Sequence, residues 1–483
     1  MKKNNFLEHF LVIGLGTIIN LLLGLLTTPI ITRLVDPIEY GKLSIFTMYS
    51  SIALMTLCLG LDQALVRYYY ECKSVNEKKT LLIKCIVLPI ILSVLLSISV
   101  VFLSCLSIIK FNTFLVTTLC LYTIIQIIYR FSILVIRLEY KSKMFSFLNI
   151  LLKILYIILA VPLLIFSKFD SLTILIFSTT FSAFICMVVS IFFQRDIWKS
   201  DRAKNSSIKK KELLKYAYPY VFSMGITTLF QAVDKISLNI YGTYSDVGIY
   251  SSAMSLVHIF AIVQSSFNTL WTPMAVEHYT KDKEDRSFYQ KGNKIITVIM
   301  FFLGISLILF KDVFSFLLGE KYREAAYILP FLIFNPIMYT ISETTVSGLV
   351  FMKKSKLQVV VAIVSCLTNI VGNLILVPIF GCKGAAMSTG ISYIMFFTLR
   401  TVLSNKHFYV DYELKKFYIL TIIVIFYALY NTFVEFNLFS IFGYVLIIVI
   451  LCILYKETIM FCFNYIIRFL RKKLKINNMN LDS

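Results

Sequence analysis

The apolar positions of this chain fall into fourteen stretches, separated by short polar connections. A helix needs about 20 mostly apolar residues to cross the hydrocarbon core of a bilayer. Backbone groups find no water there, so these lengths predict helices rather than open strands. We expect an all-α polytopic membrane protein. Its predicted spans are residues 9–32, 43–65, 85–109, 112–136, 145–166, 171–193, 217–241, 247–275, 295–317, 325–350, 357–380, 384–403, 417–434 and 438–464.

The basic residues alternate between the two sides of this arrangement. Of the 47 Lys and Arg, 37 lie in the terminal segments, in connections that follow an even-numbered span or in the adjoining ends of spans. Only 8 lie in or beside the other connections, and Lys153 and Lys235 complete the count inside predicted spans. Because basic loops stay on the cytosolic side, we expect both termini to be cytosolic. The net charge of +21 therefore comes from loops whose basic residues orient the protein in the membrane and contact anionic lipids. We expect no nucleic-acid partner.

Spans 1–6 and 7–12 resemble each other weakly. An acid, a glycine and a serine recur at an offset of 207 residues, in the pairs Glu39/Asp246, Gly41/Gly248 and Ser44/Ser251. Six helices separate the copies, so both have the same orientation and form parallel repeats about an axis normal to the membrane. We expect an N-terminal lobe at 1–193, a cytosolic linker at 194–216, a C-terminal lobe at 217–403, two further helices within 404–464 and a basic cytosolic tail at 465–483.

Several chemistries lack a sequence signature. The chain has no G-x-x-x-x-G-K-[ST] loop for ATP and no His, Cys and carboxylate cluster with metal-ligand spacing. Its ten Cys include no CxxC pair, which argues against a disulfide framework and against zinc. No outer connection is long enough to hold the active site of a glycan polymerase. We therefore expect a protein that is not an enzyme and has no cofactor or metal.

Polar residues form stripes on several predicted spans. Steps of three or four residues place Thr17 and Asn20 on one face of span 1, and comparable stripes include Gln231 on span 7 and His258 on span 8. In lipid, such faces turn toward other helices or toward a water-filled cavity. Helix packing explains any single stripe. Stripes on both equivalent pairs of spans, 1–2 and 7–8, favour a central polar cavity.

Cations inside the spans are the first candidates for substrate binding. Insertion of one costs on the order of 2.5–3.5 kcal/mol, so a reason should exist for Lys235, Lys153 and Arg130. Arg and Lys bind phosphate through charge-assisted hydrogen bonds, so we expect these three, together with Gln231, Asn20, Thr17 and His258, to contact an anionic substrate. The alternative for Lys153 is that its stem extends to the cytosolic surface.

Acids inside the spans are candidates for binding a coupling ion. Asp234 precedes Lys235, Glu343 lies deep in span 10, and Asp62 lies at the inner end of span 2. A buried carboxylate suits a proton or sodium site. For Asp62 the alternative is a local ion pair with Arg67.

Several segments resemble one known family. They are Thr27–Leu34 (TTPIITRL), Pro37–Gly41 (PIEYG), Leu59–Ala64 (LGLDQA), Asp234-Lys235 and Val247–Ala253 (VGIYSSA). Together they resemble the Wzx-type polysaccharide repeat-unit flippases. These proteins form the polysaccharide transporter branch of the multidrug/oligosaccharidyl-lipid/polysaccharide (MOP) exporter superfamily. The resemblance covers most of the chain and is best over spans 1–12.

The resemblance implies a two-lobe transporter with alternating access, as in the multidrug (MATE) exporters. Its substrate would be an undecaprenyl-pyrophosphate-linked oligosaccharide, moved from the inner to the outer leaflet of a bacterial cytoplasmic membrane for O-antigen, capsule or related glycans. Membrane lipids and other polysaccharide-assembly proteins would be further partners. Similar lipid II flippases place several Arg on spans 1 and 2, whereas span 1 here has only Arg33 at its outer rim. This departure makes Lys235 the first candidate for the pyrophosphate site.

Three alternatives remain open from the sequence. The first is a cation-coupled small-molecule exporter of the same superfamily, and the second is a lipid II flippase for peptidoglycan. The third is a membrane glycosyltransferase or polymerase, although the short outer connections disfavour it.

Overall fold

The computed structural model describes residues 3–105, 112–201 and 208–464, and within them it is built of helices without a strand. The basic tail expected at 465–483 lies outside the described residues. The helices are α1 (Lys3–Leu34), α2 (Pro37–Leu57), α3 (Leu61–Tyr68), η1 (Tyr69–Glu71), α4 (Val75–Cys105), α5 (Thr113–Leu138), α6 (Ser142–Phe166), α7 (Ser171–Phe193), α8 (Arg195–Lys199), α9 (Lys210–Tyr241), α10 (Tyr244–Val257), α11 (Phe260–Lys281), α12 (Ser287–Leu309), α13 (Lys311–Phe316), η2 (Glu320–Tyr327), α14 (Leu329–Leu332), α15 (Phe334–Thr345), α16 (Ser347–Phe351), α17 (Ser355–Asn405), α18 (Leu414–Phe433) and α19 (Leu438–Leu454).

The expected all-helical membrane architecture is confirmed, but the expected number of spans is not. In the described residues, eight helices are long and apolar enough to cross a membrane, or up to 12 if each bent pair is one span. Two features explain why the larger count is 12 rather than the fourteen spans predicted from the sequence. The polar helix α9 is not among the candidates, and α17 covers two predicted spans as one helix of 51 residues.

The helix α17 is a hairpin rather than one long rod. Gly381 has φ 55° and ψ −129°, which breaks the helix at that residue. Asn373 donates a hydrogen bond to the Ser388 hydroxyl over 3.1 Å, although 15 residues separate them. Fifteen residues of straight helix would hold the two side chains about 22 Å apart. The two halves therefore lie side by side in opposite directions, as the separate predicted spans 357–380 and 384–403 require.

In the described residues, four other predicted spans, 43–65, 247–275, 325–350 and 438–464, correspond to bent pairs of helices. Span 43–65 becomes α2 and α3, which meet at 55° where Leu59 and Gly60 adopt positive φ. The last predicted span, 438–464, is wrong as one straight helix. The helix α19 ends at Leu454, and the segment Lys456–Asn464 turns away by 82°.

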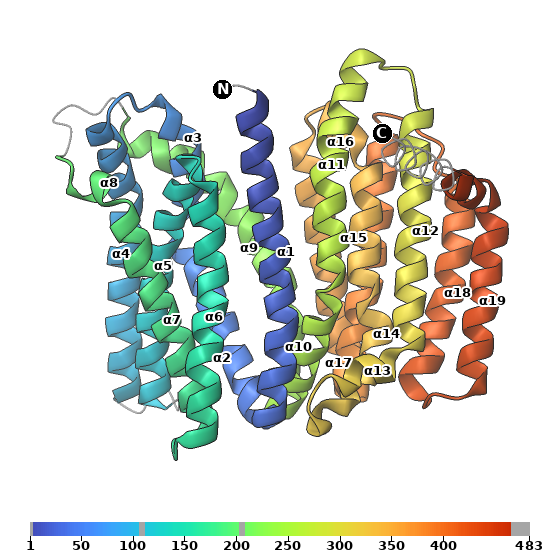
Figure 1. Ribbon diagram of the computed structural model, residues 1–483, viewed down its shortest axis with the longest axis horizontal. Coiled ribbons are helices and arrows are strands. Elements are labelled where there is room, and N and C mark those ends of the chain that lie inside the picture. The colour runs from blue at the N-terminus through green and yellow to red at the C-terminus, as the bar shows by residue number, and fades with distance from the viewer. Residues whose placement is uncertain (1–2, 106–111, 202–207, 465–483) are drawn as a thin grey trace, which may run out of the picture. The chain divides into compact units, whose positions relative to one another are not determined.

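Contacts group the chain into two units. Unit 1 consists of residues 1–259 and 318–322, and unit 2 consists of residues 260–317 and 323–483. These units are defined by contacts between residues, whereas the predicted lobes 1–193 and 217–403 are defined by the sequence repeat. The units therefore do not test the predicted lobe boundaries, which stay a prediction. Figure 1 shows α4, α5, α6 and α7 running alongside one another within unit 1.

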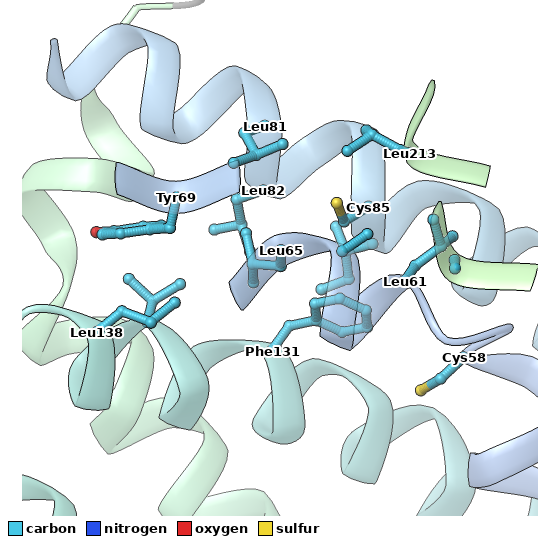
Figure 2. Packing of buried hydrophobic residues seen from close by; sticks show 14 of the residues in the cluster. Cys58, Leu61, Leu65, Tyr69, Leu81, Leu82, Cys85, Phe131, Leu138 and Leu213 are labelled. Carbon is cyan, nitrogen blue, oxygen red and sulfur yellow. The ribbon is translucent and has the colours of Figure 1, made fainter. Parts of the chain in front are cut away.

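A buried apolar cluster anchors the bent end of α2 in unit 1. Leu61 and Leu65 of α3 pack with Leu82 of α4 and Phe131 of α5, all nearly inaccessible to solvent. Figure 2 shows these side chains meeting, with Leu213 from α9 in the same cluster. The cluster fixes α3 against three other helices and so places the Asp62 side chain, which follows Leu61.

In unit 2, a buried lysine ties α13 to α18. Lys311 is fully buried and donates hydrogen bonds to the carbonyl oxygens of Asn431 and of Val434, the latter over 3.0 Å. Its ammonium also lies 4.5 Å from the centre of the Tyr327 ring. The last carbonyls of a helix lack partners within the helix and carry partial negative charge, so a cation stabilises them.

The segment Leu318–Tyr322 packs onto the turn between α1 and α2, within unit 1. The Gly319 amide donates to the Thr32 hydroxyl over 3.2 Å, and the Tyr322 hydroxyl donates to the Val35 carbonyl over 3.0 Å. A Cβ on Gly319 would lie 2.1 Å from the Thr32 carbonyl oxygen, so only glycine permits this approach. The turn that begins α2 is thus held by a segment almost 290 residues further along the chain.

Helices α2 and α10 meet along a seam that is symmetric in the sequence repeat. The Ser44 and Ser251 hydroxyls share a hydrogen bond of 2.6 Å, and these serines are 207 residues apart. A Cβ on Gly41 would lie 1.8 Å from the Tyr244 carbonyl oxygen. Reciprocally, a Cβ on Gly248 would lie 2.1 Å from the Pro37 carbonyl oxygen. The two serines are equivalent positions of the repeat, and the Gly41–Tyr244 and Gly248–Pro37 contacts are equivalent to each other.

Reciprocal contacts between equivalent residues indicate an approximate two-fold axis through the seam, as in the self-complementary interface of a symmetric dimer. Gly41 also lies against Gly248, as Ser44 lies against Ser251, so these partner numbers increase together and α2 and α10 run in the same direction. This arrangement agrees with the parallel repeat expected from the sequence. Close approach through small residues is typical of helix pairs in membranes, where backbones must pack without a hydrophobic driving force.

We expect that Gly41→Val or Gly248→Val will each destabilise the protein by about 1–3 kcal/mol or more, since the added Cβ meets backbone atoms that cannot rotate away. Thermal unfolding in detergent, followed by size-exclusion chromatography, measures the effect. Gly24→Ala is the matched control, because a Cβ on this helical glycine meets no atom within 4 Å. Equal melting of all three variants would show that the seam does not pack as described.

Candidate functional site

Two lysines and a histidine ring, Lys153, Lys235 and His258, form the candidate site of unit 1, and we name them the cationic group after the two lysines. Lys153 lies on α6, Lys235 on α9 and His258 at the C-terminal end of α10. Both lysines lie close enough to the His258 ring to act on its charge. The sequence thus named three residues from separate predicted spans that the fold brings together.

The two lysines of the cationic group are half-buried. Within the described part of the chain, neither ammonium forms a hydrogen bond or an ion pair. Burial of like charges near one another is costly unless an anion offsets them. The nearest acid in sequence, Asp234, adjoins Lys235 and acts on its charge. The cationic group therefore has the electrostatic character of an anion-binding site.

Asp234 is turned into unit 1. Its side chain is buried, with 5% of its surface exposed, and accepts a hydrogen bond of 2.8 Å from the Tyr250 hydroxyl. Tyr250 belongs to α10 and is itself buried, so this bond fixes α9 against α10 close to the symmetric seam. Asp234 thus makes a structural contact, and the cation Lys235 is the next residue in the chain.

The remaining polar candidates of unit 1 lie on the surfaces of α1 and α9. Thr17 is exposed and Asn20 is half-buried on α1, where the Asn20 side-chain oxygen is enclosed without a hydrogen-bond partner among the described residues. Gln231 is exposed on α9, one turn before Lys235. Their part in substrate binding stays a prediction.

The structure pairs two residues for which the sequence suggested separate roles. Arg130 donates to the Asp62 carboxylate through Nη2 over 2.6 Å and through Nε over 3.0 Å. The Asp62 side chain is 1% exposed and that of Arg130 is 30% exposed. Arg67, the local partner considered for Asp62, instead pairs with Glu71 over 2.6 Å at the surface. Part of the Arg130 charge is therefore already offset within the protein.

The third acid, Glu343, also has a partner, and the sequence missed it. Arg400 donates through Nη1 to Glu343 over 2.8 Å and to the Ser342 hydroxyl over 2.7 Å, within unit 2. The sequence analysis counted Arg400 among the basic residues of a cytosolic connection. It instead lies inside α17 and is buried. The sequence did contain a signal for this pair. Arg400 lies within the predicted span 384–403, and the predicted span 325–350 contains the acid Glu343, for which the sequence suggested no partner.

In the described residues, no group of three or more His, Cys, Asp or Glu side chains is arranged to hold a metal ion. The cysteines described there are free thiols. The chemistry that this arrangement supports is electrostatic binding by Lys and Arg side chains.

Removal of the acid from the Asp62–Arg130 pair should be costly. Asp62→Asn leaves Arg130 without its counter-charge, and we expect a loss of about 2–3 kcal/mol, less than for a fully buried pair because Arg130 is partly solvated. The double variant Asp62→Asn/Arg130→Gln should recover most of that loss. Thermal unfolding in detergent measures both.

Arg67→Gln is the control for this pair, because exposed ion pairs contribute only about 0–1 kcal/mol. If Asp62→Asn and Arg67→Gln have the same melting temperature, the Asp62–Arg130 pair contributes no more to stability than an exposed ion pair.

Comparisons with known proteins identify the fold. A structure described as "Lipid II flippase MurJ, inward closed conformation" matches with a TM-score of 0.69 over 95% of this chain and 100% of that chain, at 16% sequence identity. An outward-facing multidrug resistance MATE family transporter of the MOP superfamily matches with a TM-score of 0.59 over 83% of this chain and 94% of that chain, at 14% identity. The chain thus has the fold of the MOP-superfamily transporters.

Sequence comparison finds a relative and a family model that are named for glycan or polysaccharide biosynthesis. A curated relative, "Probable low-salt glycan biosynthesis flippase Agl15" of Haloferax volcanii, is 24% identical over 236 residues, or 48% of each chain. The chain thus matches about half the length of this relative. The family model described as "Polysaccharide biosynthesis protein" matches residues 6–278, which include α1 to α10 and the whole cationic group. This multi-pass membrane protein therefore belongs to the polysaccharide biosynthesis protein family.

Proposed function

We propose that this protein moves an undecaprenyl-pyrophosphate-linked oligosaccharide from the inner to the outer leaflet of a bacterial cytoplasmic membrane. The glycan would serve capsule, O-antigen or related surface polysaccharide assembly. The observation that carries the proposal is the cationic group of Lys153, Lys235 and His258 within unit 1 of a chain in this family. The flippase relative and the MOP-type fold support it.

The physical barrier to this movement lies in the head of the substrate. The polyprenyl tail can stay in lipid, whereas the pyrophosphate and the sugars lose their water if they enter the hydrocarbon core. Positive charges that lack partners within the protein can replace that water around the phosphates. Lys153 and Lys235 provide such charges on two helices of unit 1.

The transport mechanism we propose is alternating access without covalent chemistry. The two repeats, 1–193 and 217–403, would rock about the substrate, with both termini in the cytosol. The candidates for a coupling-ion site are Asp234, Asp62 and Glu343, of which Asp62 and Glu343 are each bound to an arginine. Asp234 instead lies beside Lys235, so a change in its protonation would change the charge of the cationic group.

We expect Lys235→Gln and Lys153→Gln each to slow translocation by roughly tenfold, since a hydrogen bond to a charged group contributes about 1.5–3 kcal/mol. The assay uses the full-length protein in liposomes with a fluorescent undecaprenyl-pyrophosphate-linked oligosaccharide. A membrane-impermeant quencher then reports the fraction that has reached the outer leaflet.

Lys281→Gln is the control, because this lysine is exposed on α11 and pairs with Glu277 at the surface. Wild-type rates in both lysine variants would disprove the role of the cationic group. If the wild-type protein moves no lipid-linked glycan but exports small cations against a proton or sodium gradient, the exporter alternative holds. If the protein moves lipid II as fast as the fluorescent oligosaccharide lipid, the alternative of a lipid II flippase for peptidoglycan is supported instead.

A further inference from the structure

The helix α15 of unit 2 is buried except for one polar stripe. Every residue of Phe334–Thr345 is buried apart from Asn335, Tyr339 and Glu343, which are half-buried. Steps of four residues place these three on one face of the helix. A membrane protein that turned this face toward acyl chains would expose an amide, a phenol and a carboxylate to hydrocarbon, which is expensive. The stripe therefore faces other parts of the protein or water rather than acyl chains.

Aromatic rings from α17 cover part of the same face. Phe396 stacks on Tyr339, with ring centres 5.8 Å apart and planes inclined by 9°. Tyr393 lies one turn away, with its ring centre 6.1 Å from that of Phe396. All three rings are half-buried, so each keeps part of its surface accessible. Together, Tyr339, Tyr393 and Phe396 form an aromatic platform on unit 2.

A charged pair borders the aromatic platform. The Arg400 guanidinium lies 5.9 Å from the centre of the Tyr339 ring and 5.4 Å from that of Phe396. Within the described residues, Arg400 donates hydrogen bonds only through Nη1, to Ser342 and Glu343. A guanidinium carries five N–H donors, so Nε and Nη2 keep donors for another partner. The platform therefore combines aromatic faces with directional polar groups and no net charge.

From this combination we propose that Tyr339 and Phe396, together with the Glu343–Arg400 pair, bind the sugar portion of the transported lipid-linked glycan. A sugar ring presents polarised C–H groups on its faces and hydroxyls at its edge. The C–H groups suit the negative face of an aromatic ring, and the hydroxyls suit a carboxylate beside a guanidinium. The inference rests on the proposed function and assigns the glycan to unit 2.

The charge of the aromatic platform distinguishes it from the cationic group. Arg400 is neutralised by Glu343, so the platform has little attraction for a pyrophosphate, whereas no ion pair is described for Lys153 or Lys235. The platform therefore suits sugar, and the cationic group suits phosphate. Loss of the platform should weaken recognition of sugar without changing recognition of phosphate.

A binding experiment with two lipid probes tests this separation. The full-length protein in lipid nanodiscs is titrated with undecaprenyl pyrophosphate carrying an oligosaccharide, and separately with undecaprenyl pyrophosphate without sugar. Tyr339→Leu and Phe396→Leu remove an aromatic face and keep an apolar side chain of similar size, which limits damage to the fold. We expect each variant to bind the sugar-bearing probe roughly tenfold more weakly and the sugar-free probe as the wild type does.

Two further variants sharpen the result. Tyr339→Phe keeps the ring and should retain most of the affinity for the sugar-bearing probe. Phe439→Ala removes an exposed ring of α19 from outside the platform and should change neither affinity. Melting temperatures identify any variant that has lost its fold, and the other leucine variant then carries the test.

Two outcomes would overturn the inference. One is unchanged affinity for the sugar-bearing probe in both leucine variants, and the other is an equal loss for both probes. The proposed function fails separately, if the wild-type protein in liposomes does not translocate the sugar-bearing lipid. A protein that binds glycan through the platform but moves no lipid would keep this inference and lose the proposed function.

Discussion

The cost of holding charge away from water governs the arrangement of this protein. Several charges inside the spans have a partner within the fold. Asp62 and Glu343 are bound to arginines, and Lys311 neutralises the carbonyl end of a helix. Lys153 and Lys235 have no such compensation. An anionic ligand would therefore gain the most binding free energy beside these two lysines.

The same constraint separates the two kinds of recognition described above. Positive charge in unit 1 suits phosphate, whereas the neutralised pair and aromatic rings of unit 2 suit a surface of hydroxyl and C–H groups. A lipid-linked glycan has both kinds of surface joined by one covalent bond. Division of recognition in this way lets the phosphate contacts stay constant while the sugar contacts determine which glycan is accepted.

The sequence was sufficient for the helical architecture, because lengths of apolar sequence and alternating basic connections are strong and local signals. It also located the lysines of the cationic group, since a charge within an apolar stretch is visible without a structure. Pairings were harder. Arg130 and Asp62 are 68 positions apart, and no periodicity within either helix reveals that the fold joins them. Arg400 was missed because its position near the end of a span resembles that of an ordinary interfacial anchor. The last span was drawn too long because Lys456–Asn464 remains apolar after the helix turns.

The seam between α2 and α10 has a consequence for how such a chain evolves. Gly41 and Gly248 descend from one ancestral position if the repeat arose by duplication, and each now limits what the other's helix tolerates. A larger side chain in either copy presses on the backbone of its twin, so neither half is free to diverge alone there. Where the two copies do not touch, each can change without the other. At this crossing a substitution in one copy is limited by the backbone of the other.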